Sequence, residues 1–178
     1  MTSKQDIINA ILEAEAGYVD NPDDSGGKTN YGITEGMARF YGYEGDMRDL
    51  PCSFAFEVYA AIFWYAVGAD HLLVLSGPVT AEVVDTAVNC GPHRAGEILQ
   101  RALNVLNLKG DLYDDLTADG VIGSRTLRAL QSYLEHRDEQ TLVKMLNVLQ
   151  GAFYVELAER REKDESFIYG WFNKRVVL

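Results

Sequence analysis

The first residues of the chain show a helical pattern of apolar positions. At 100° per residue one stripe is continuous, so residues 4–17 are expected to form an amphipathic helix. The stripe consists of Ile7, Ile8, Ile11 and Leu12. Glu15 falls in the middle of it, at the last turn, where the pattern calls for a hydrophobic side chain. If the helix end is frayed, Glu15 instead turns out to water.

A turn-rich segment follows at residues 18–34. Gly26-Gly27 marks a turn, and the residues after it alternate as those of a strand do. The alternating set is Thr29, Tyr31 and Ile33. Thr34 has the character of a helix N-cap, with Glu35 in the first turn. The pattern therefore predicts a small β-hairpin, or an extended loop, between two helices.

The remainder of the chain reads as helical. Residues 53–67 are apolar on nearly all sides, with Ser53 as the expected N-cap, which predicts a helix central to the core. Residues 78–106 form two helices broken at Gly91-Pro92, and residues 138–162 form a long amphipathic helix. The apolar face expected for the long helix is Leu142, Met145, Leu146, Leu149, Phe153 and Leu157. The fold class is mainly α, a helical bundle with a small β-hairpin.

Length and composition are those of an ordinary globular protein. The chain has 178 residues, 47% of them hydrophobic and 24% charged, enough for one large domain or two small ones. Gly77-Pro78 is the expected seam, which gives parts at residues 1–76 and 77–178. Because the seam lacks linker composition, the two parts are expected to pack together.

The net charge, the cysteines and the histidines limit the classes of partner and ligand that are expected. The formal net charge of −11 argues against nucleic acid. Two cysteines, Cys52 and Cys90, fit a reducing compartment, and the three histidines show no metal spacing, so neither metal nor cofactor is expected. The start has no apolar signal segment, and the longest apolar run is too short to span a bilayer. We therefore expect a monomer made in the cytoplasm, without membrane insertion.

The position of Glu15 suggests acid chemistry. Burial disfavours the charged form of a carboxyl group. A carboxylic acid that stays protonated near neutral pH is what a glycosidase needs in order to protonate the leaving oxygen of its substrate.

The same stretch resembles the N-terminal motif of glycoside hydrolase family 108. That motif is Glu-Gly-Gly-Tyr followed by an Asp- and Gly-rich hairpin; here it reads Glu15-Ala16-Gly17-Tyr18 and then DDSGGKTNYGIT at residues 23–34. Ala16 departs from the family's glycine, which matters only if the backbone needs positive φ there. The resemblance implies a lysozyme-like α+β fold, a phage or prophage endolysin with N-acetylmuramidase activity, and Glu15 as the catalytic acid.

A further resemblance, to phage-type lysozymes, lies in the order of Glu, Asp and Thr. It implies that Asp24 and Thr29 hold the attacking water, although Asp20 and Asp23 compete with Asp24 for this role. The family motif further implies that Tyr18, Tyr31 and Thr34 contact the substrate.

Motifs in the second half resemble a peptidoglycan-binding module. They include the turn Asp119-Gly120-Val121-Ile122-Gly123, a stretch around Asn89, and Gly170-Trp171. The resemblance implies peptidoglycan as the partner, with Asn89 and Trp171 as candidate glycan contacts. The alternative is structural: a turn residue at Asp119, a helix C-cap at Asn89 and a packing anchor at Trp171.

Three functions remain open at this stage. The first is a muramidase that cleaves the β-1,4 bond between N-acetylmuramic acid and N-acetylglucosamine, released from the host cytoplasm to act on the cell wall. A lytic transglycosylase is a variant that needs the acid but no second carboxylate to activate water. The second is a non-catalytic wall-binding or secretion-assisting protein in which Glu15 is idle. The third is an unrelated helical domain, which the density of motifs disfavours.

Overall fold

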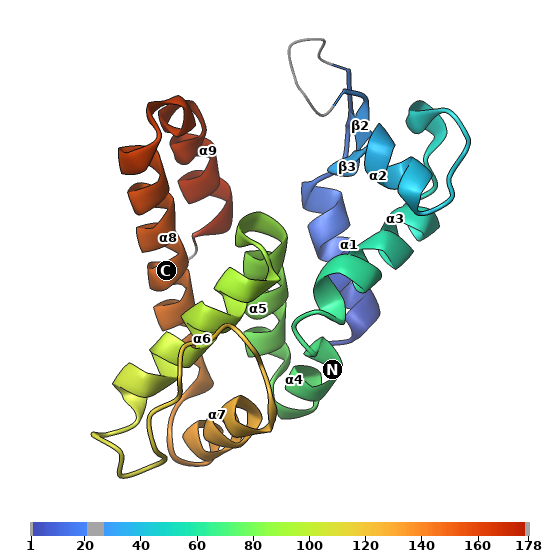
Figure 1. The fold of residues 1–178 in the computed structure, drawn as a ribbon. Helices are drawn as coiled ribbons and strands as arrows, with labels where there is room; N and C mark the ends of the chain where they lie inside the picture. Colours follow the sequence, from blue (N-terminus) through green and yellow to red (C-terminus); the bar gives the residue numbers. More distant parts are fainter. Residues whose placement is uncertain (1, 21–26, 177–178) are drawn as a thin grey trace. The chain divides into compact units, whose positions relative to one another are not determined.

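The computed structural model describes residues 2–20 and 27–176. The chain divides into two compact units, Met1–Tyr65 and Ala66–Leu178 (Figure 1). The boundary predicted at Gly77 lies C-terminal to this division. Gly77 is in the first turn of a helix whose N-cap is Ser76. The architecture is mainly α with one small antiparallel sheet, as the sequence pattern predicts.

The first unit combines short helices with the sheet. Its elements are α1 (Lys4–Ala14), β1 (Tyr18–Val19), β2 (Thr29–Asn30), β3 (Ile33–Thr34), α2 (Glu35–Phe40), the 3₁₀ helix η1 (Met47–Asp49), α3 (Cys52–Tyr59) and the π-helix η2 (Ala60–Trp64). α1 packs against α3, and the sheet packs against η1.

Helix α1 buries the predicted apolar stripe but is shorter than expected. A capping box between Ser3 and Asp6 starts the helix. The helix ends at Ala14 rather than at residue 17, with Glu15 as its C-cap. The reason lies just beyond, where Gly17 takes a φ of 134° and the chain turns into β1. φ at Ala16 is not positive, so the replacement of the family's glycine does not strain the backbone.

The sheet has three strands, in the order β1-β2-β3, instead of a single hairpin. Tyr18 pairs with Asn30, and Asn30 pairs with Ile33. A two-residue turn joins β2 to β3, and its residues Tyr31 and Gly32 have φ values of 50° and 69°. Positive φ at both positions is what a type I′ hairpin turn requires. Thr34 caps α2 through the Met37 N–H, as predicted.

The apolar helix of the first unit differs from expectation at its start. Pro51, not Ser53, occupies the N-cap of α3 and makes no side-chain cap. Residue Trp64, at the end of η2, is completely buried, so this aromatic belongs to the core. Tyr65 is exposed and accepts a hydrogen bond from Lys4 (Nζ to Oη, 2.9 Å).

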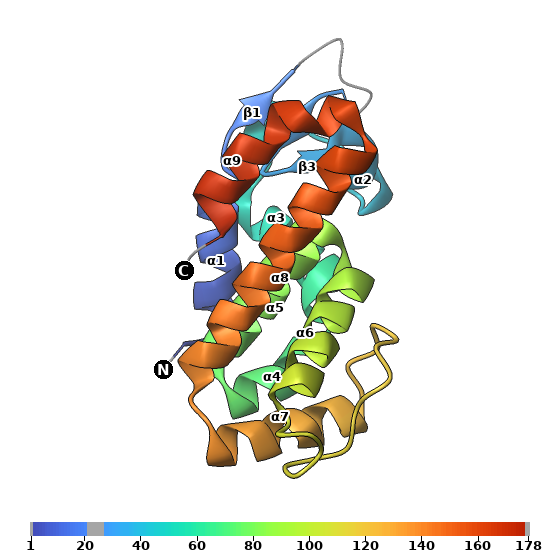
Figure 2. The same ribbon diagram turned by 90° about the vertical axis from the view of Figure 1, so that its left-hand side faces the viewer.

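The second unit is helical throughout its regular elements. These are α4 (Ala69–Leu75), α5 (Gly77–Cys90), α6 (Pro92–Leu106), α7 (Ser124–His136), α8 (Glu139–Arg160), the 3₁₀ helix η3 (Glu162–Asp164) and α9 (Glu165–Arg175). α5 and α6 meet at Gly91-Pro92, where the break was predicted. α8 packs against α5, α6 and α9, and lies beside α5 and α6 in Figure 2.

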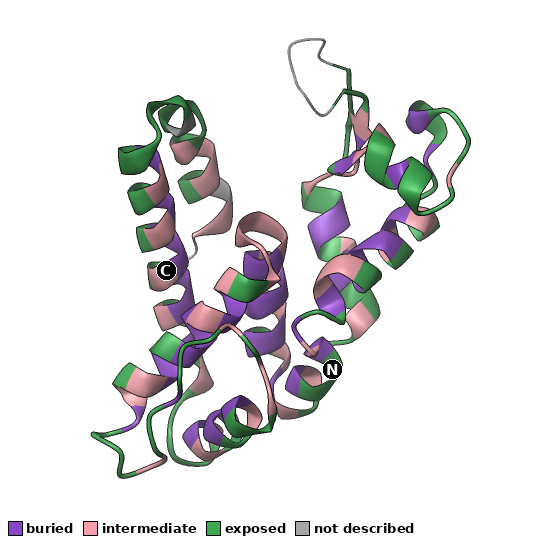
Figure 3. Ribbon diagram, viewed as in Figure 1, coloured by how far each residue is buried: buried purple, intermediate pink, exposed green. Residues whose placement is uncertain are grey.

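The buried face of α8 differs from the predicted one (Figure 3). Leu142 and Leu146 are buried as expected, but Met145, Leu149, Phe153 and Leu157 are only half-buried. The buried positions are Leu142, Leu146, Asn147, Gln150, Gly151, Tyr154 and Ala158. The polar members are buried because α8 is covered by three helices, which reach beyond its apolar stripe.

Among the described residues, no single helix is long and apolar enough to cross a membrane, while one broken pair, Cys52–Trp64 with Ala69–Leu75, passes on length and composition only.

Candidate active site and peptidoglycan-binding motifs

Glu15 is held at the C-terminal end of α1. Its backbone N–H donates to the carbonyl oxygen of Ile11 at 3.0 Å, which fixes the main chain in the helical region at this last position. The side chain is half-buried, whereas Glu13, two residues earlier, is exposed. The helical pattern therefore placed the two carboxyl groups correctly.

The Glu15 carboxylate lies beside the turn between β2 and β3. A Cβ atom added to Gly32 would lie 3.5 Å from Glu15 Oε2 and 2.8 Å from the hydroxyl oxygen of Tyr59. Tyr59 donates a hydrogen bond from that hydroxyl to the carbonyl oxygen of Tyr31, at 2.9 Å. α1, the hairpin turn and α3 therefore converge on one point beside the candidate acid.

Sequence reasoning missed Gly32 and Tyr59 as members of this site. Gly32 belongs to the recognised motif, but nothing local indicates which side chain it faces. Tyr59 lies within an apolar helical run, where its ring is expected to pack in the core and is 5% exposed. Its hydroxyl group is the only local sign that it could have a polar partner.

Thr29 and Thr34 lie on one face of the sheet, because residues directly paired across antiparallel strands point the same way. Both are half-buried. The hydroxyl of Thr29 donates to the carbonyl oxygen of Gly27 at 3.2 Å. The opposite face carries Asn30 and Ile33, both buried, and Asn30 anchors the sheet by donating to the carbonyl oxygen of Met47 at 2.7 Å.

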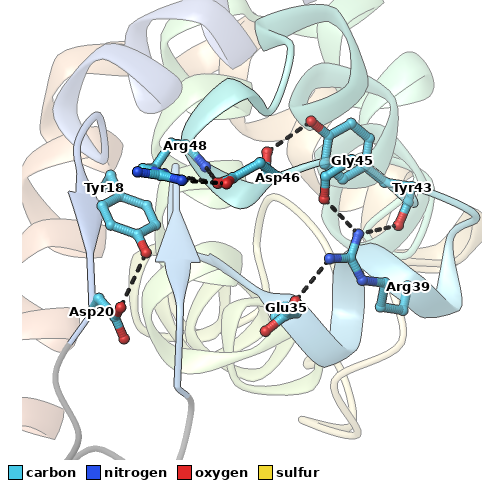
Figure 4. A network of polar contacts seen from close by, with 8 residues as sticks. All are labelled: Tyr18, Asp20, Glu35, Arg39, Tyr43, Gly45, Asp46 and Arg48. Carbon is cyan, nitrogen blue, oxygen red and sulfur yellow. Dashed lines mark hydrogen bonds and ion pairs between the residues drawn. The ribbon is translucent and has the colours of Figure 1, made fainter.

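Tyr18 begins a polar network at the edge of the sheet (Figure 4). Its hydroxyl donates to Asp20 Oδ2 at 3.2 Å. Partial burial, and then the charge of Asp20, raise the pKa of Tyr18. Nearby, Arg48 forms a bidentate ion pair with Asp46. The Nη2–Oδ2 distance is 2.6 Å and the Nε–Oδ1 distance is 3.0 Å. Hydrogen bonding to Arg48 holds the pKa of Asp46 well below its usual range.

Asp24, the predicted partner of Glu15, lies outside the described residues, as does its competitor Asp23. The third candidate, Asp20, is exposed and bonded to Tyr18. Among the described residues, no group of three His, Cys, Asp or Glu side chains is placed to hold a metal ion. Cys52 and Cys90 are both free thiols, and burial raises the pKa of Cys90 to about 12.

In the second unit, Asn89 belongs to a half-buried polar cluster. It lies in the last turn of α5, and its amide donates to the carbonyl oxygen and to Oδ2 of Asp85, at 2.8 Å and 3.2 Å. Asp85 also pairs with Arg175 of α9, with an Nη1–Oδ1 distance of 2.7 Å. Gly91, rather than Asn89, is the C-cap of α5.

The turn at Asp119 is fastened to α6. Gln100 of α6 is buried; its Nε2 donates to Asp119 Oδ1 at 2.8 Å, and its Oε1 accepts the Gly120 N–H at 2.8 Å. The hydrogen bond from Gln100 lowers the pKa of Asp119. A pocket of about 220 Å³ lies beside this turn, with Asp119, Arg125 and Gln100 among its lining residues.

Trp171 lies on α9 within a short aromatic stack. Its ring centroid is 5.3 Å from that of Tyr154 and 6.0 Å from that of Phe167. Tyr154 is buried and Phe167 is exposed, so the stack leads from the core of the unit to its surface.

Two family models match the chain, one in each half. Residues 8–91 match the family model for glycosyl hydrolase 108. This segment of the chain is a glycosyl hydrolase 108 domain. Residues 94–176 match a second model, the predicted peptidoglycan domain. The glycosyl hydrolase 108 match contains Glu15, the sheet and Asn89, and the peptidoglycan match contains the turn at Asp119 and Trp171.

Among solved structures, that of SagA from Brucella abortus is similar to this protein. The two share 26% sequence identity with a TM-score of 0.68, over 96% of this chain and 87% of the SagA chain. No curated protein matches the chain significantly. A glycosidase domain joined to a peptidoglycan domain makes this protein a peptidoglycan hydrolase.

Proposed function

We propose that this peptidoglycan hydrolase is an N-acetylmuramidase with Glu15 as its general acid. In this proposal it cleaves the β-1,4 bond between N-acetylmuramic acid and N-acetylglucosamine. The observation that carries the proposal is the half-buried Glu15 carboxyl group beside Gly32, where the chain has no side chain. That site lies within the glycosyl hydrolase 108 match, and the stretch that contains Glu15 resembles the motif of that family.

The reaction needs one proton donor and one water. Glu15 donates its proton to the bridging oxygen as the bond from that oxygen to C1 of the muramic sugar breaks, which gives an oxocarbenium-like transition state. A water adds to C1, and the proton that it gives up restores the protonated form of Glu15. We assign the positioning of this water to Asp24 and Thr29. Thr29 lies on β2, two residues before the turn that borders Glu15.

Substrate contacts are proposed on both units. Tyr18 and Thr34 lie on strands β1 and β3, and Tyr31 lies in the turn between β2 and β3. In the second unit, Trp171 offers an aromatic surface for a sugar ring, and Asn89 an amide. In this proposal, residues 1–76 carry out catalysis and residues 77–178 bind the cell wall.

The test is digestion of purified peptidoglycan with mass spectrometry of the products. Wild type should release fragments with reducing N-acetylmuramic ends, and Glu15→Gln, which keeps the shape of the side chain without the transferable proton, should release none. The matched control is Glu13→Gln, since Glu13 is exposed on the same helix. Equal activity of wild type and Glu15→Gln would remove Glu15 from the mechanism.

The products also separate the alternatives. Anhydro-muramic ends would identify a lytic transglycosylase, which ejects the leaving group without adding water. No products from wild type, together with retained binding to peptidoglycan, would favour a non-catalytic wall-binding protein.

A further inference from the structure

We propose that Tyr59 is a positioning residue for Glu15. This inference rests on the proposed function, because it takes Glu15 to be the acid. The hydroxyl of Tyr59 lies on the same side of Gly32 as the Glu15 carboxylate, since both border the point where a Cβ of residue 32 would be. Tyr59 holds the hairpin turn, and the turn supports the carboxyl group.

The turn needs such a support. Tyr31 has a φ of 50°, and the left-handed region is unfavourable for a residue other than glycine. Such a conformation persists only where the surroundings impose it. The hydrogen bond from Tyr59 to the Tyr31 carbonyl oxygen, 2.9 Å long, connects this strained residue to a side chain 28 positions further along the chain, at the end of α3.

Tyr59 is itself held rigidly. Its side chain is 5% exposed, and its ring centroid lies 5.3 Å from that of Phe63. It is the last residue of α3, directly before the π-helix η2. π-helical turns are rare and are frequent at functional sites. A fixed hydroxyl can therefore set the position of the turn rather than follow it.

Gly32 allows the hairpin turn to approach Tyr59 and Glu15 closely. With a φ of 69° it completes the turn without a side chain, and an added Cβ would meet the Tyr59 hydroxyl at 2.8 Å, closer than real contacts allow. The turn can thus come close to both the hydroxyl and the carboxylate. Any shift of the turn would change the space beside Glu15, where the leaving oxygen of the sugar must approach.

The test compares two Tyr→Phe variants that each delete one hydrogen bond of the same kind. Tyr59→Phe removes the bond to the Tyr31 carbonyl, and Tyr43→Phe removes a bond of the same length, 2.9 Å, from a hydroxyl to the Asp46 carbonyl in the same unit. Activity is measured on soluble glycan strands prepared from peptidoglycan, and folding is checked by circular dichroism.

Tyr59→Phe should lower kcat roughly 10- to 100-fold and change KM by no more than about twofold, because a misplaced acid impairs the chemical step rather than binding. Tyr43→Phe should keep wild-type kcat. If Tyr59→Phe has the same kcat as Tyr43→Phe, or if it changes KM alone, the positioning role is overturned.

A second variant keeps the test decisive if Tyr59→Phe folds poorly. Gly32→Ala should also lower kcat, because its methyl group meets the Tyr59 hydroxyl and because alanine is strained at a φ of 69°. A folded Gly32→Ala with the kcat of wild type would contradict the proposal. Where Tyr59→Phe folds, the loss in the double variant should be smaller than the product of the two single losses, since removing the hydroxyl relieves the clash.

Glu15→Gln in the same assay separates the two levels of inference. If Glu15→Gln retains activity, the proposed function itself fails. If Glu15→Gln is inactive while Tyr59→Phe matches Tyr43→Phe, the acid stands and only the role of Tyr59 is lost.

Discussion

Gly96 of α6 and Gly120 of the Asp119 turn touch backbone to backbone. A Cβ atom on Gly96 would lie 2.1 Å from the carbonyl oxygen of Gly120. Gln100 stabilises this contact, because its side chain forms hydrogen bonds with both Asp119 and Gly120. The motif that marks the peptidoglycan domain is therefore, in this protein, a turn locked onto a helix. Gly120 serves packing in this turn, whatever the adjoining pocket binds.

Gly96→Ala should destabilise the second unit by about 1–3 kcal/mol, the usual cost of overpacking, because the new methyl group meets fixed backbone. Thermal unfolding measures the effect. Gly170→Ala on α9 is the matched control, since nothing lies within 4 Å of its added Cβ. There, alanine should be neutral or stabilising by up to about 1 kcal/mol, as in a helix interior. Equal stability of Gly96→Ala and wild type would refute the close contact.

Glu82 on α5 should make stability depend on pH. Burial is the main cause that raises its pKa from 4.5 to about 7, and the charge of Asp85 adds to the shift, while a hydrogen bond from Asn147 opposes it. The unfolded chain loses this proton near pH 4.5, whereas the folded protein keeps it until about pH 7. The stability that Glu82 contributes is therefore complete below pH 4.5 and is lost as the pH rises through 7.

Glu82→Gln isolates this contribution, because Gln is neutral at every pH. At pH 4 the variant and wild type should unfold at similar temperatures, and at pH 8 the variant should be more stable by on the order of 2–3 kcal/mol. Glu159→Gln, at an exposed position of α8, is the control and should leave the pH dependence of unfolding as it is in wild type. A stability difference that stays constant from pH 4 to pH 8 would disprove the assignment.

Trp171 should contribute to wall binding if its aromatic stack contacts glycan. Trp171→Leu retains apolar bulk for packing against Tyr154 but removes the indole surface. It should weaken co-sedimentation with insoluble peptidoglycan about 10-fold or more, in line with the weight of buried Trp residues at binding sites. Tyr169→Ala, at an 81% exposed position of the same helix, should bind as wild type does. Unchanged binding by a folded Trp171→Leu would leave Trp171 as a packing residue only.

Several features of the fold could be predicted because they depend on neighbouring residues. The buried stripe of α1, the N-cap at Thr34 and the break at Gly91-Pro92 all follow from periodicity, capping or backbone restriction within a few positions. Local rules were less successful at element ends. α1 ends at Ala14 because Gly17 leaves the helical conformation, and α3 begins after Pro51 without the predicted Ser53 cap.

The buried face of α8 shows a second limit. An apolar stripe predicts which residues are able to face a core, but the number of covering helices decides which residues do. Asn147 and Gln150 are buried because α5, α6 and α9 enclose the helix on several sides.

By itself, the sequence determined that the chain is mainly helical, that Glu15 stands apart from Glu13 on the apolar side of its helix, and which motifs link it to glycosyl hydrolase 108 and a peptidoglycan domain. Tertiary structure alone decided that Gly32 and Tyr59 meet beside Glu15, and that Gln100 fastens the Asp119 turn. These contacts join residues far apart in the chain, 28 positions for Tyr31 and Tyr59 and 19 for Gln100 and Asp119. Periodicity and propensity act over one or two turns of chain, so they carry no information on which distant groups will meet once the core has packed.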